Sequence, residues 1–204
     1  MIRVNIINNL ENLIETIMVK LFMILIGCTP AGRHTEQHDV FFGVGKEPKD
    51  LIPEMISFWP EAKGKLHVDG WREVNFVDKY KITVEVKDVR DPAPDADINK
   101  LFFINLGGYK VNEFEEFHYK MLAVGKHKGE AIQQSKQTAF YKHTGYKGAT
   151  SHVDDKYGID VDDAYEITDI LPPALKHKYK LNILPVTNAG VDEIHLGYFM
   201  LHKL

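Results

Sequence analysis

Residues 20–27 read KLFMILIG, and residues 100–107 read KLFFINLG. A short apolar run closed by glycine is typical of a buried β-strand. Its return deep inside the chain indicates an internal repeat. The match continues without a gap until residues 44–46 and 124–126, which both read VGK. We therefore interpret the chain as two copies of one structural unit.

Each copy has the pattern of two strands, a helix and further strands. Residues 21–26 predict a strand that is covered on both faces, and residues 38–44 predict a second strand that pairs with it as a hairpin. From Asp50, which we predict as the helix N-cap, apolar residues recur at helical spacing until Pro60. Alternating or β-branched segments around residues 66–68, 74–76 and 80–86 predict two or three more strands.

Beyond the helix, the second copy is predicted to resume after an insertion of five residues. His67-Val68-Asp69 then matches His152-Val153-Asp154, and three further matches follow. These pair Asp78, Tyr80 and Ile82 with Asp163, Tyr165 and Ile167. A third, truncated copy is predicted at the end of the chain, where Glu193, His195 and Lys203 keep the spacing of Glu36, His38 and Lys46.

These patterns predict an α+β fold, with a mainly antiparallel sheet, helices packed on one face and a C-terminal β-hairpin that closes it. The residues between the copies read DVRDPAPDADIN and cannot continue a sheet. The predicted segments are an N-terminal extension at 1–19, repeat 1 at 20–87, a linker at 88–99, repeat 2 at 100–170 and the hairpin at 171–204. The extension is interpreted as either a helix or a mis-annotated start, because Met18 could serve as an initiator.

Composition narrows the class of protein. The chain has 204 residues, is 44% hydrophobic and 26% charged, and carries a net charge of −4, which gives no general attraction to nucleic acid or to anionic membranes. Its one cysteine, Cys28, requires no oxidising compartment. Leu25-Ile26-Gly27-Cys28 could be read as a lipoprotein cleavage site, but its copy lies inside the chain, so we interpret it as a strand end. The sequence therefore predicts a cytoplasmic protein.

The stretch KLFMILIGCTPAGRHTEQHDVFFGVGK and its copy KLFFINLGGYKVNEFEEFHYKMLAVGK resemble the bacterial domain-of-unknown-function family numbered 1543. The resemblance covers about residues 20–170. It implies a bacterial cytosolic protein with one or two copies of the domain in each chain. It brings no known activity, ligand or catalytic residue.

Three segments carry the pattern Glu-x-His. A strand places two such side chains on one face, about 7 Å apart, and imidazole and carboxylate are common zinc ligands. The metal candidates are therefore Glu36, His38, Glu116, His118, Glu193 and His195. The alternative, which we favour, is that each Glu accepts a hydrogen bond from its own His or from a nearby backbone N–H and fixes the entrance of its strand.

Two further polar patterns recur. His67 with Asp69, and His152 with Asp154, form half of a general-base arrangement, although a turn contact is the more common explanation. Lys46 and Lys126 follow a glycine just before the predicted helices, where an anion could bind, but the phosphate-loop pattern is absent. We favour a strand-to-helix turn as the role of the segments around Lys46 and Lys126.

Two functional classes remain open. The first is a non-catalytic module that binds a small molecule or a protein. The second is a hydrolase-like enzyme that uses a metal or a His–carboxylate pair at the junction of the repeats. We favour the first, because the architecture is repeated and the sequence shows no unique catalytic set. No catalytic residue and no cofactor is predicted, with zinc or another divalent metal as the alternative. Homo-oligomerisation is left open.

Overall fold

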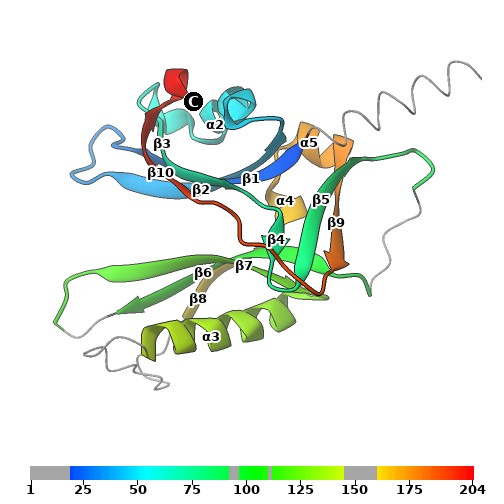
Figure 1. Ribbon diagram of the computed structural model, residues 1–204. Helices are drawn as coiled ribbons and strands as arrows, with labels where there is room; N and C mark the ends of the chain where they lie inside the picture. Colours follow the sequence, from blue (N-terminus) through cyan, green and yellow to red (C-terminus); the bar gives the residue numbers. More distant parts are fainter. Residues whose placement is uncertain (1–18, 92–96, 110–111, 145–159) are drawn as a thin grey trace, which may run out of the picture. The chain divides into compact units, whose positions relative to one another are not determined.

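A computed structural model describes residues 19–91, 97–109, 112–144 and 160–204 (Figure 1). The chain divides into two compact units. Unit 1 is Met1–Asp91 with Leu171–Leu204, and unit 2 is Pro92–Ile170. The predicted N-terminal extension lies outside the described residues except for Val19.

Unit 1 contains a four-stranded antiparallel sheet in the order β10-β3-β1-β2. The strands are β1 (Lys20–Cys28), β2 (Gln37–Gly45), β3 (His67–Glu73) and β10 (His195–Met200). A short 3-10 turn, η1 (Pro48–Leu51), leads into α2 (Ile52–Phe58), and η2 (Pro60–Ala62) follows it. The helix covers one face of the sheet (Figure 1).

The core of unit 1 lies between that sheet and α2. Phe22, Ile24 and Ile26 alternate along β1 and pack with Leu51 and Met55 in one buried cluster. The apolar run of β1 was predicted to be covered on both faces, and its odd-numbered residue Leu21 is buried as well. A period of two therefore assigns the even positions of β1 to the helix side and the odd positions to the other face.

A second sheet in unit 1 has the order β4-β5-β9. It consists of β4 (Phe76–Val77), β5 (Tyr80–Val86) and β9 (Tyr179–Pro185), and α5 (Pro173–Lys178) precedes β9. Ile82 and Val84 of β5 are buried.

Unit 2 contains a three-stranded antiparallel sheet in the order β7-β6-β8. Its elements are β6 (Lys100–Tyr109), β7 (Glu116–Gly125), α3 (Lys128–Thr144), β8 (Asp160–Glu166) and α4 (Ile167–Ile170). Phe102, Ile104 and Leu106 of β6 pack with Ala123 and Ala131, and α3 runs along one face of the sheet (Figure 1). The order strand, strand, helix, strand thus occurs in both units.

The strand pairing is the same in both units. Phe22 of β1 faces Glu73 of β3, and Phe102 of β6 faces Glu166 of β8. These pairs give an offset of 80 between β1 and β6 (22 to 102) and of 93 between β3 and β8 (73 to 166). A register shift also falls at the matching place, between residues 25 and 26 of β1 and between residues 105 and 106 of β6.

The predicted match beyond the helix is therefore wrong. It matched Tyr165 to Tyr80 in sequence. In the structure Tyr165 faces Phe103 in the same way that Arg72 faces Met23, so Tyr165 corresponds to Arg72. The sequence match failed because α3 and the connection after it are together longer than α2 and its connection, so β8 lies further along the chain than the predicted offset.

The predicted C-terminal hairpin is also corrected. β9 pairs with β5 and β10 pairs with β3, so the two strands join different sheets instead of each other. Asp192, just before β10, accepts hydrogen bonds from the backbone N–H groups of Asn75 (3.0 Å) and Phe76 (3.2 Å). These contacts direct the chain to the free edge of β3.

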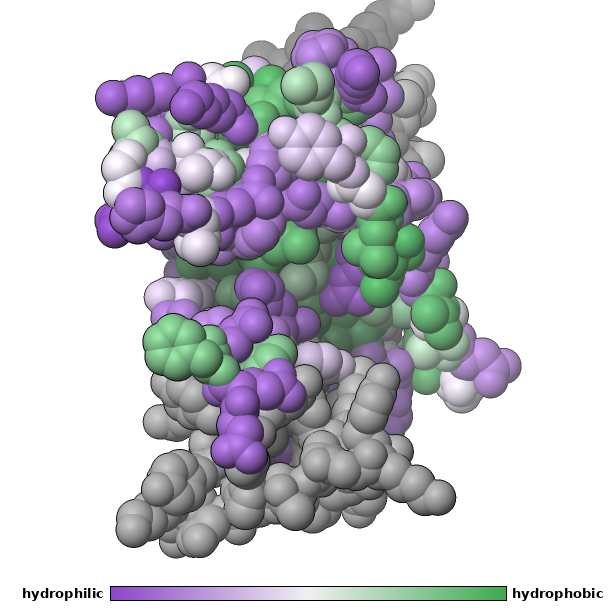
Figure 2. All heavy atoms as spheres, turned by 90° about the vertical axis from the view of Figure 1, so that its left-hand side faces the viewer, coloured by the Kyte–Doolittle hydropathy of each residue, from purple (hydrophilic) through white to green (hydrophobic). Residues whose placement is uncertain are grey.

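The α+β fold class with mostly antiparallel sheets is confirmed. Among the described residues, no helix has the length and apolar character needed to cross a membrane. Figure 2 shows a face on which hydrophilic side chains predominate and hydrophobic ones are also exposed. Exposed apolar residues of unit 1 include Val191, Ile194, Leu196 and Tyr198.

Candidate functional site

One row of residues crosses three strands of unit 1 on the face opposite α2. Gly27 of β1 faces His38 of β2 on one side and His67 of β3 on the other. Directly opposed residues in a sheet point to the same face. Because the even positions of β1 pack toward the helix, Gly27 and both histidines lie on the other face.

The glycine at the centre of this row makes room for the side chains around it. A Cβ atom at position 27 would lie 2.6 Å from Oδ2 of Asp69, 2.7 Å from Nε2 of His67 and 3.0 Å from Cδ2 of His38. Real Cβ atoms essentially never show contacts under 3.0 Å. The two imidazoles and the carboxylate therefore meet above a residue that has no side chain.

Four side chains form the resulting cluster, which we call the His–carboxylate cluster: Glu36, His38, His67 and Asp69. Nε2 of His67 lies 3.0 Å from Oε1 of Glu36 and 3.4 Å from Oδ1 of Asp69. Nε2 of His38 lies 3.2 Å from Oδ2 of Asp69 and 3.7 Å from Oε2 of Glu36. Each imidazole therefore contacts both carboxylates.

Asp69 owes its position to the irregularity in β3. Leu25 of β1 faces Gly70 and Ile26 faces Val68, so Asp69 is the extra residue at the register shift. Such bulges re-aim a side chain and are common beside functional sites.

The cluster is buried at one end and open at the other. His67 is 3% exposed, and its ring lies 4.3 Å from the ring of Tyr198, tilted by 31°. The side chains of Glu36 and His38 are 43% and 39% exposed. A small ligand in solvent can therefore reach the outer members.

The buried end contains polar atoms that lack a hydrogen bond. Within the described part of the chain, both ring nitrogens of His67 and Oδ2 of Asp69 are buried and have no hydrogen-bond partner. The contacts of Nε2 with the carboxylates are short, but they do not meet hydrogen-bond geometry. Buried polar atoms of this kind require an explanation, such as a bound group.

The charge of the cluster is not balanced by basic residues. In the described residues, neither Glu36 nor Asp69 pairs with a lysine or an arginine; their ion-pair contacts are with His38 and His67. Two carboxylates thus face two imidazoles.

Cys28 lies next to this cluster in sequence and does not contribute a reactive thiol. Its side chain is fully buried. Burial is the main cause that raises the pKa of the Cys28 thiol, and the negative charge of Glu36 raises it further. A protonated, inaccessible thiol is a poor nucleophile.

The other predicted metal ligands lie elsewhere. In unit 2, Nε2 of His118 is 4.0 Å from Oε2 of Glu116, and its Nδ1 is 3.3 Å from Nδ2 of Asn105. His152 and Asp154 lie outside the described residues. Among the described side chains, at their present positions, no group of three or more His, Cys, Asp or Glu could hold a metal ion.

The third Glu-x-His pair has a structural contact of its own. The ring of His195 stacks on Trp71, with centroids 3.8 Å apart and an interplanar angle of 16°. Nδ1 of His195 is 3.9 Å from Oε1 of Glu193, whose side chain is 81% exposed. This pair therefore helps to attach β10 to β3, and among the described residues its contacts are with Trp71 and within the pair.

The backbone N–H groups of Lys46 and Lys126 are already occupied. The N–H of Lys46 donates to Oδ2 of Asp50 (3.0 Å), and that of Lys126 donates to Oε2 of Glu130 (2.8 Å). Asp50 also accepts from the N–H of Glu47 (3.2 Å), so Glu47 is the N-cap and Asp50 stands at the third position of η1. The prediction of Asp50 as the N-cap is corrected, and these contacts favour a structural turn.

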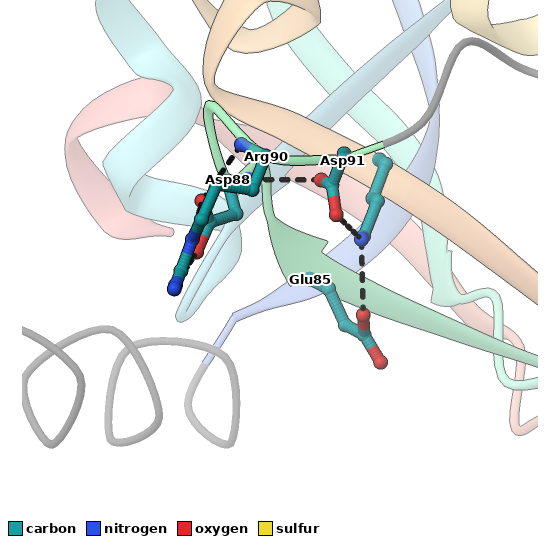
Figure 3. Close-up of polar contacts among 5 residues, drawn as sticks. Glu85, Asp88, Arg90 and Asp91 are labelled. Carbon is teal, nitrogen blue, oxygen red and sulfur yellow. Dashed lines mark hydrogen bonds and ion pairs between the residues drawn. The ribbon is translucent and has the colours of Figure 1, made fainter.

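A surface network at the end of β5 was not predicted from the sequence (Figure 3). Asp88 pairs with Arg90 (2.7 Å), and Asp91 pairs with Lys180 (2.7 Å), which also lies 3.7 Å from Glu85. Hydrogen bonds from Arg90 hold the pKa of the Asp88 carboxyl well below its usual range. The ammonium of Lys180 likewise lowers the pKa of Asp91, and Asp91 raises that of Lys180.

Unit 2 has a surface cavity of about 270 Å³ near the start of α3. Its walls carry three lysines, but Lys100 pairs with Glu166 (2.9 Å) and Lys126 pairs with Asp97 (2.9 Å). The basic groups of this cavity are therefore largely neutralised by their own neighbours.

The comparisons with known proteins concern the family and the fold, and they name no activity or ligand. The family model described as Domain of Unknown Function (DUF1543) matches residues 33–84, a segment that contains all four members of the cluster. The chain is similar to the crystal structure of a protein Il1583 from Idiomarina loihiensis, with a TM-score of 0.58 and 22% sequence identity over 90% of this chain and 98% of that one. No curated protein matches the chain.

Proposed function

We propose that the protein is a non-catalytic binding module built from an internal duplication, and that a small ligand binds at the His–carboxylate cluster of unit 1. The observation that carries this proposal is the convergence of Glu36, His38, His67 and Asp69 above Gly27. A few convergent polar groups that are buried at one end and accessible at the other are typical of a ligand site.

The internal duplication is supported by contacts that recur at matching positions. Lys20 pairs with Glu73 in unit 1, and Lys100 pairs with Glu166 in unit 2. Asp50 and Glu130 accept hydrogen bonds from the backbone N–H groups of Lys46 and Lys126, which hold matching positions in the two units. The register shift beside the third strand of each sheet is a further match. A common ancestral unit explains all three.

A binding role fits the chemistry of the site better than catalysis through a covalent intermediate. An activated nucleophile needs a base within hydrogen-bond reach and access to substrate. Cys28 is fully buried and its thiol pKa is raised, so it does not meet these requirements. The cluster itself consists of two imidazoles and two carboxylates, which can bind a ligand or move a proton.

The second candidate function is that of a hydrolase-like enzyme. The contacts of His38 with Asp69 (3.2 Å) and of His67 with Glu36 (3.0 Å) favour it, because an imidazole oriented by a carboxylate can act as a general base. Such an enzyme would activate water, since the site offers no accessible thiol. Turnover of an ester or amide substrate that His38→Gln abolishes would favour this candidate.

We also propose that the protein works in the bacterial cytoplasm. The single cysteine supports this proposal, because no disulfide can form within the chain.

A thermal-shift screen tests the binding proposal. A ligand that binds the folded state raises the melting temperature, and the rise depends on ligand concentration. We expect compounds that stabilise the wild-type protein to lose their effect in Glu36→Gln and His38→Gln, which alter exposed members of the cluster. His118→Gln, at the matching position in unit 2, is the control and should keep the effect. Compounds that stabilise all three variants equally would show that the site lies elsewhere.

A further inference from the structure

We infer that the ligand of the His–carboxylate cluster is a divalent transition-metal ion such as Zn²⁺. The inference rests on the proposed binding function and deepens it by naming the class of ligand. It assigns the metal to four residues of one unit, Glu36, His38, His67 and Asp69, and not to the three Glu-x-His pairs.

The spacing of the four side chains is the first argument. Zinc binds imidazole nitrogen and carboxylate oxygen at about 2.0–2.2 Å with tetrahedral geometry, so two ligand atoms on one ion are about 3.3–3.6 Å apart. The four contacts between the Nε2 atoms and the carboxylate oxygens are 3.0, 3.2, 3.4 and 3.7 Å. The distances are close to the spacing that a shared ion requires, but each contact uses a different oxygen. To bind one ion, each carboxylate must turn one oxygen toward both nitrogens.

The chemistry of the donors is the second argument. Two neutral imidazoles and two carboxylates give a ligand set that suits zinc and similar metals, and its charge of −2 matches the charge of the ion. Among the described residues, no lysine or arginine already balances Glu36 or Asp69. A dication at this place replaces the missing basic partner.

The buried imidazole is the third, independent argument. His67 is only 3% exposed, and its ring lies against the ring of Tyr198. Neither of its ring nitrogens has a hydrogen bond in the described structure. An ion on Nε2 satisfies that nitrogen, and the same ion satisfies Oδ2 of Asp69, which is also buried without a hydrogen bond. Without a bound group, these buried atoms lack the hydrogen bonds that would offset their desolvation.

The ion requires a local adjustment of the outer side chains. At their present positions, the described His, Cys, Asp and Glu residues form no group of three or more that could hold a metal ion. Glu36 and His38 are the members that can move, because 43% and 39% of their side chains are exposed. His67 and Asp69, which are more buried, provide the fixed part of the site.

Zinc binding to the untagged full-length protein tests this inference. Isothermal titration with Zn²⁺, followed by metal analysis of the dialysed protein, should give one ion per chain. His38→Gln and Asp69→Asn should each weaken binding at least about tenfold, since even residues behind the ligands change metal affinity about 10–100-fold. His118→Gln is the matched control and should bind as the wild type does. Cobalt binding gives a second readout, because its visible absorption reports a four-coordinate site with nitrogen and oxygen ligands.

Circular dichroism of each variant separates loss of ligand from loss of fold. Asp69→Asn alters a more buried side chain, so the conclusion rests on His38→Gln and on Glu36→Gln, which should weaken zinc binding in the same way and whose side chains are more exposed. Absence of zinc binding, or equal weakening by His118→Gln and His38→Gln, would overturn the metal assignment. If zinc does not bind but compounds from the thermal-shift screen lose their effect in His38→Gln, the metal assignment is wrong and the proposed binding function stands. If neither zinc nor any compound depends on the cluster, both are wrong.

Discussion

Gly27 faces His67 across β1 and β3, and a Cβ atom at position 27 would lie 2.7 Å from Nε2 of that histidine. A glycine here thus determines whether two histidines and an aspartate can meet on this face of the sheet. The relationship connects a backbone position in the predicted strand to the chemistry of the His–carboxylate cluster.

Gly27→Ala should therefore damage the cluster. The added methyl group would displace His67 and Asp69, and overpacking of this kind costs about 1–3 kcal/mol. We expect a lower free energy of unfolding by chemical denaturation and a loss of ligand binding at the cluster. Gly129→Ala in α3 is the control, because a Cβ there meets its nearest neighbour at 3.5 Å, and this variant should be neutral or slightly stabilising. Normal stability and normal binding in Gly27→Ala would contradict the account.

His38 and His67 should be energetically coupled. Both contact Glu36 and Asp69, so replacing one histidine changes the surroundings of the other. A double-mutant cycle with His38→Gln and His67→Gln should give an interaction energy above about 0.5 kcal/mol, as residues in one network do. The cycle between His38→Gln and His118→Gln should be additive within about 0.5 kcal/mol, because His118 is not a member of the cluster. Additivity in both cycles would show that the cluster does not act as a unit.

The acid stability of the protein should depend on Asp91. The ammonium of Lys180 and the backbone N–H of Asp88 hold the pKa of Asp91 below its usual range. Since the folded-state pKa is lower than the unfolded one, the contribution is present above about pH 4 and is lost as pH falls through the folded-state pKa. Asp91→Asn should therefore destabilise the protein at neutral pH.

Denaturation curves measured from neutral to strongly acidic pH check this prediction. The difference in free energy of unfolding between wild type and Asp91→Asn should shrink as the pH falls. Asp97→Asn is the control, because its ion pair with Lys126 is largely exposed and should contribute little. A difference that grows toward acid would have the wrong sign for a lowered pKa.

Cys28 should be unreactive in the native protein. It is fully buried, and burial together with the charge of Glu36 raises the pKa of its thiol. Because the chain has one cysteine, a thiol reagent reports this position alone. We expect slow reaction in the native state, including in Glu36→Gln because burial is the larger cause, and full reaction in denaturant. Rapid native labelling would indicate that the strand end is open.

The sequence predicted the strands and the α+β class well where the apolar pattern was strong. The run from Leu21 to Ile26 lies within β1, and its copy lies within β6, because a strand covered by neighbours needs a continuous apolar segment. The position of β8 could not be predicted in the same way, since its register depends on the length of the connection after α3. The path of β10 also depends on a long-range contact, that of Asp192 with Asn75 and Phe76.

For the candidate site, the sequence identified all four residues but not their meeting. Glu36 with His38, and His67 with Asp69, appeared as two separate pairs, each with a simple structural explanation. Pairing of β2 and β3 on either side of Gly27 brings them together, and this pairing is a property of the sheet and not of either segment. A glycine within an apolar strand was the one local signal, since it often marks a close approach.

Histidine side-chain NMR tests the central claim most directly. Long-range spectra that correlate ring protons with ring nitrogens resolve individual imidazoles, and the ten histidines can be assigned from single His→Gln variants. When a stabilising ligand or Zn²⁺ is added to saturation, the account predicts that the Nε2 signals of His38 and His67 move together, whereas those of His118 and His195 stay in place. Unchanged signals of His38 and His67 with a ligand demonstrably bound would contradict the assignment of the site to the His–carboxylate cluster.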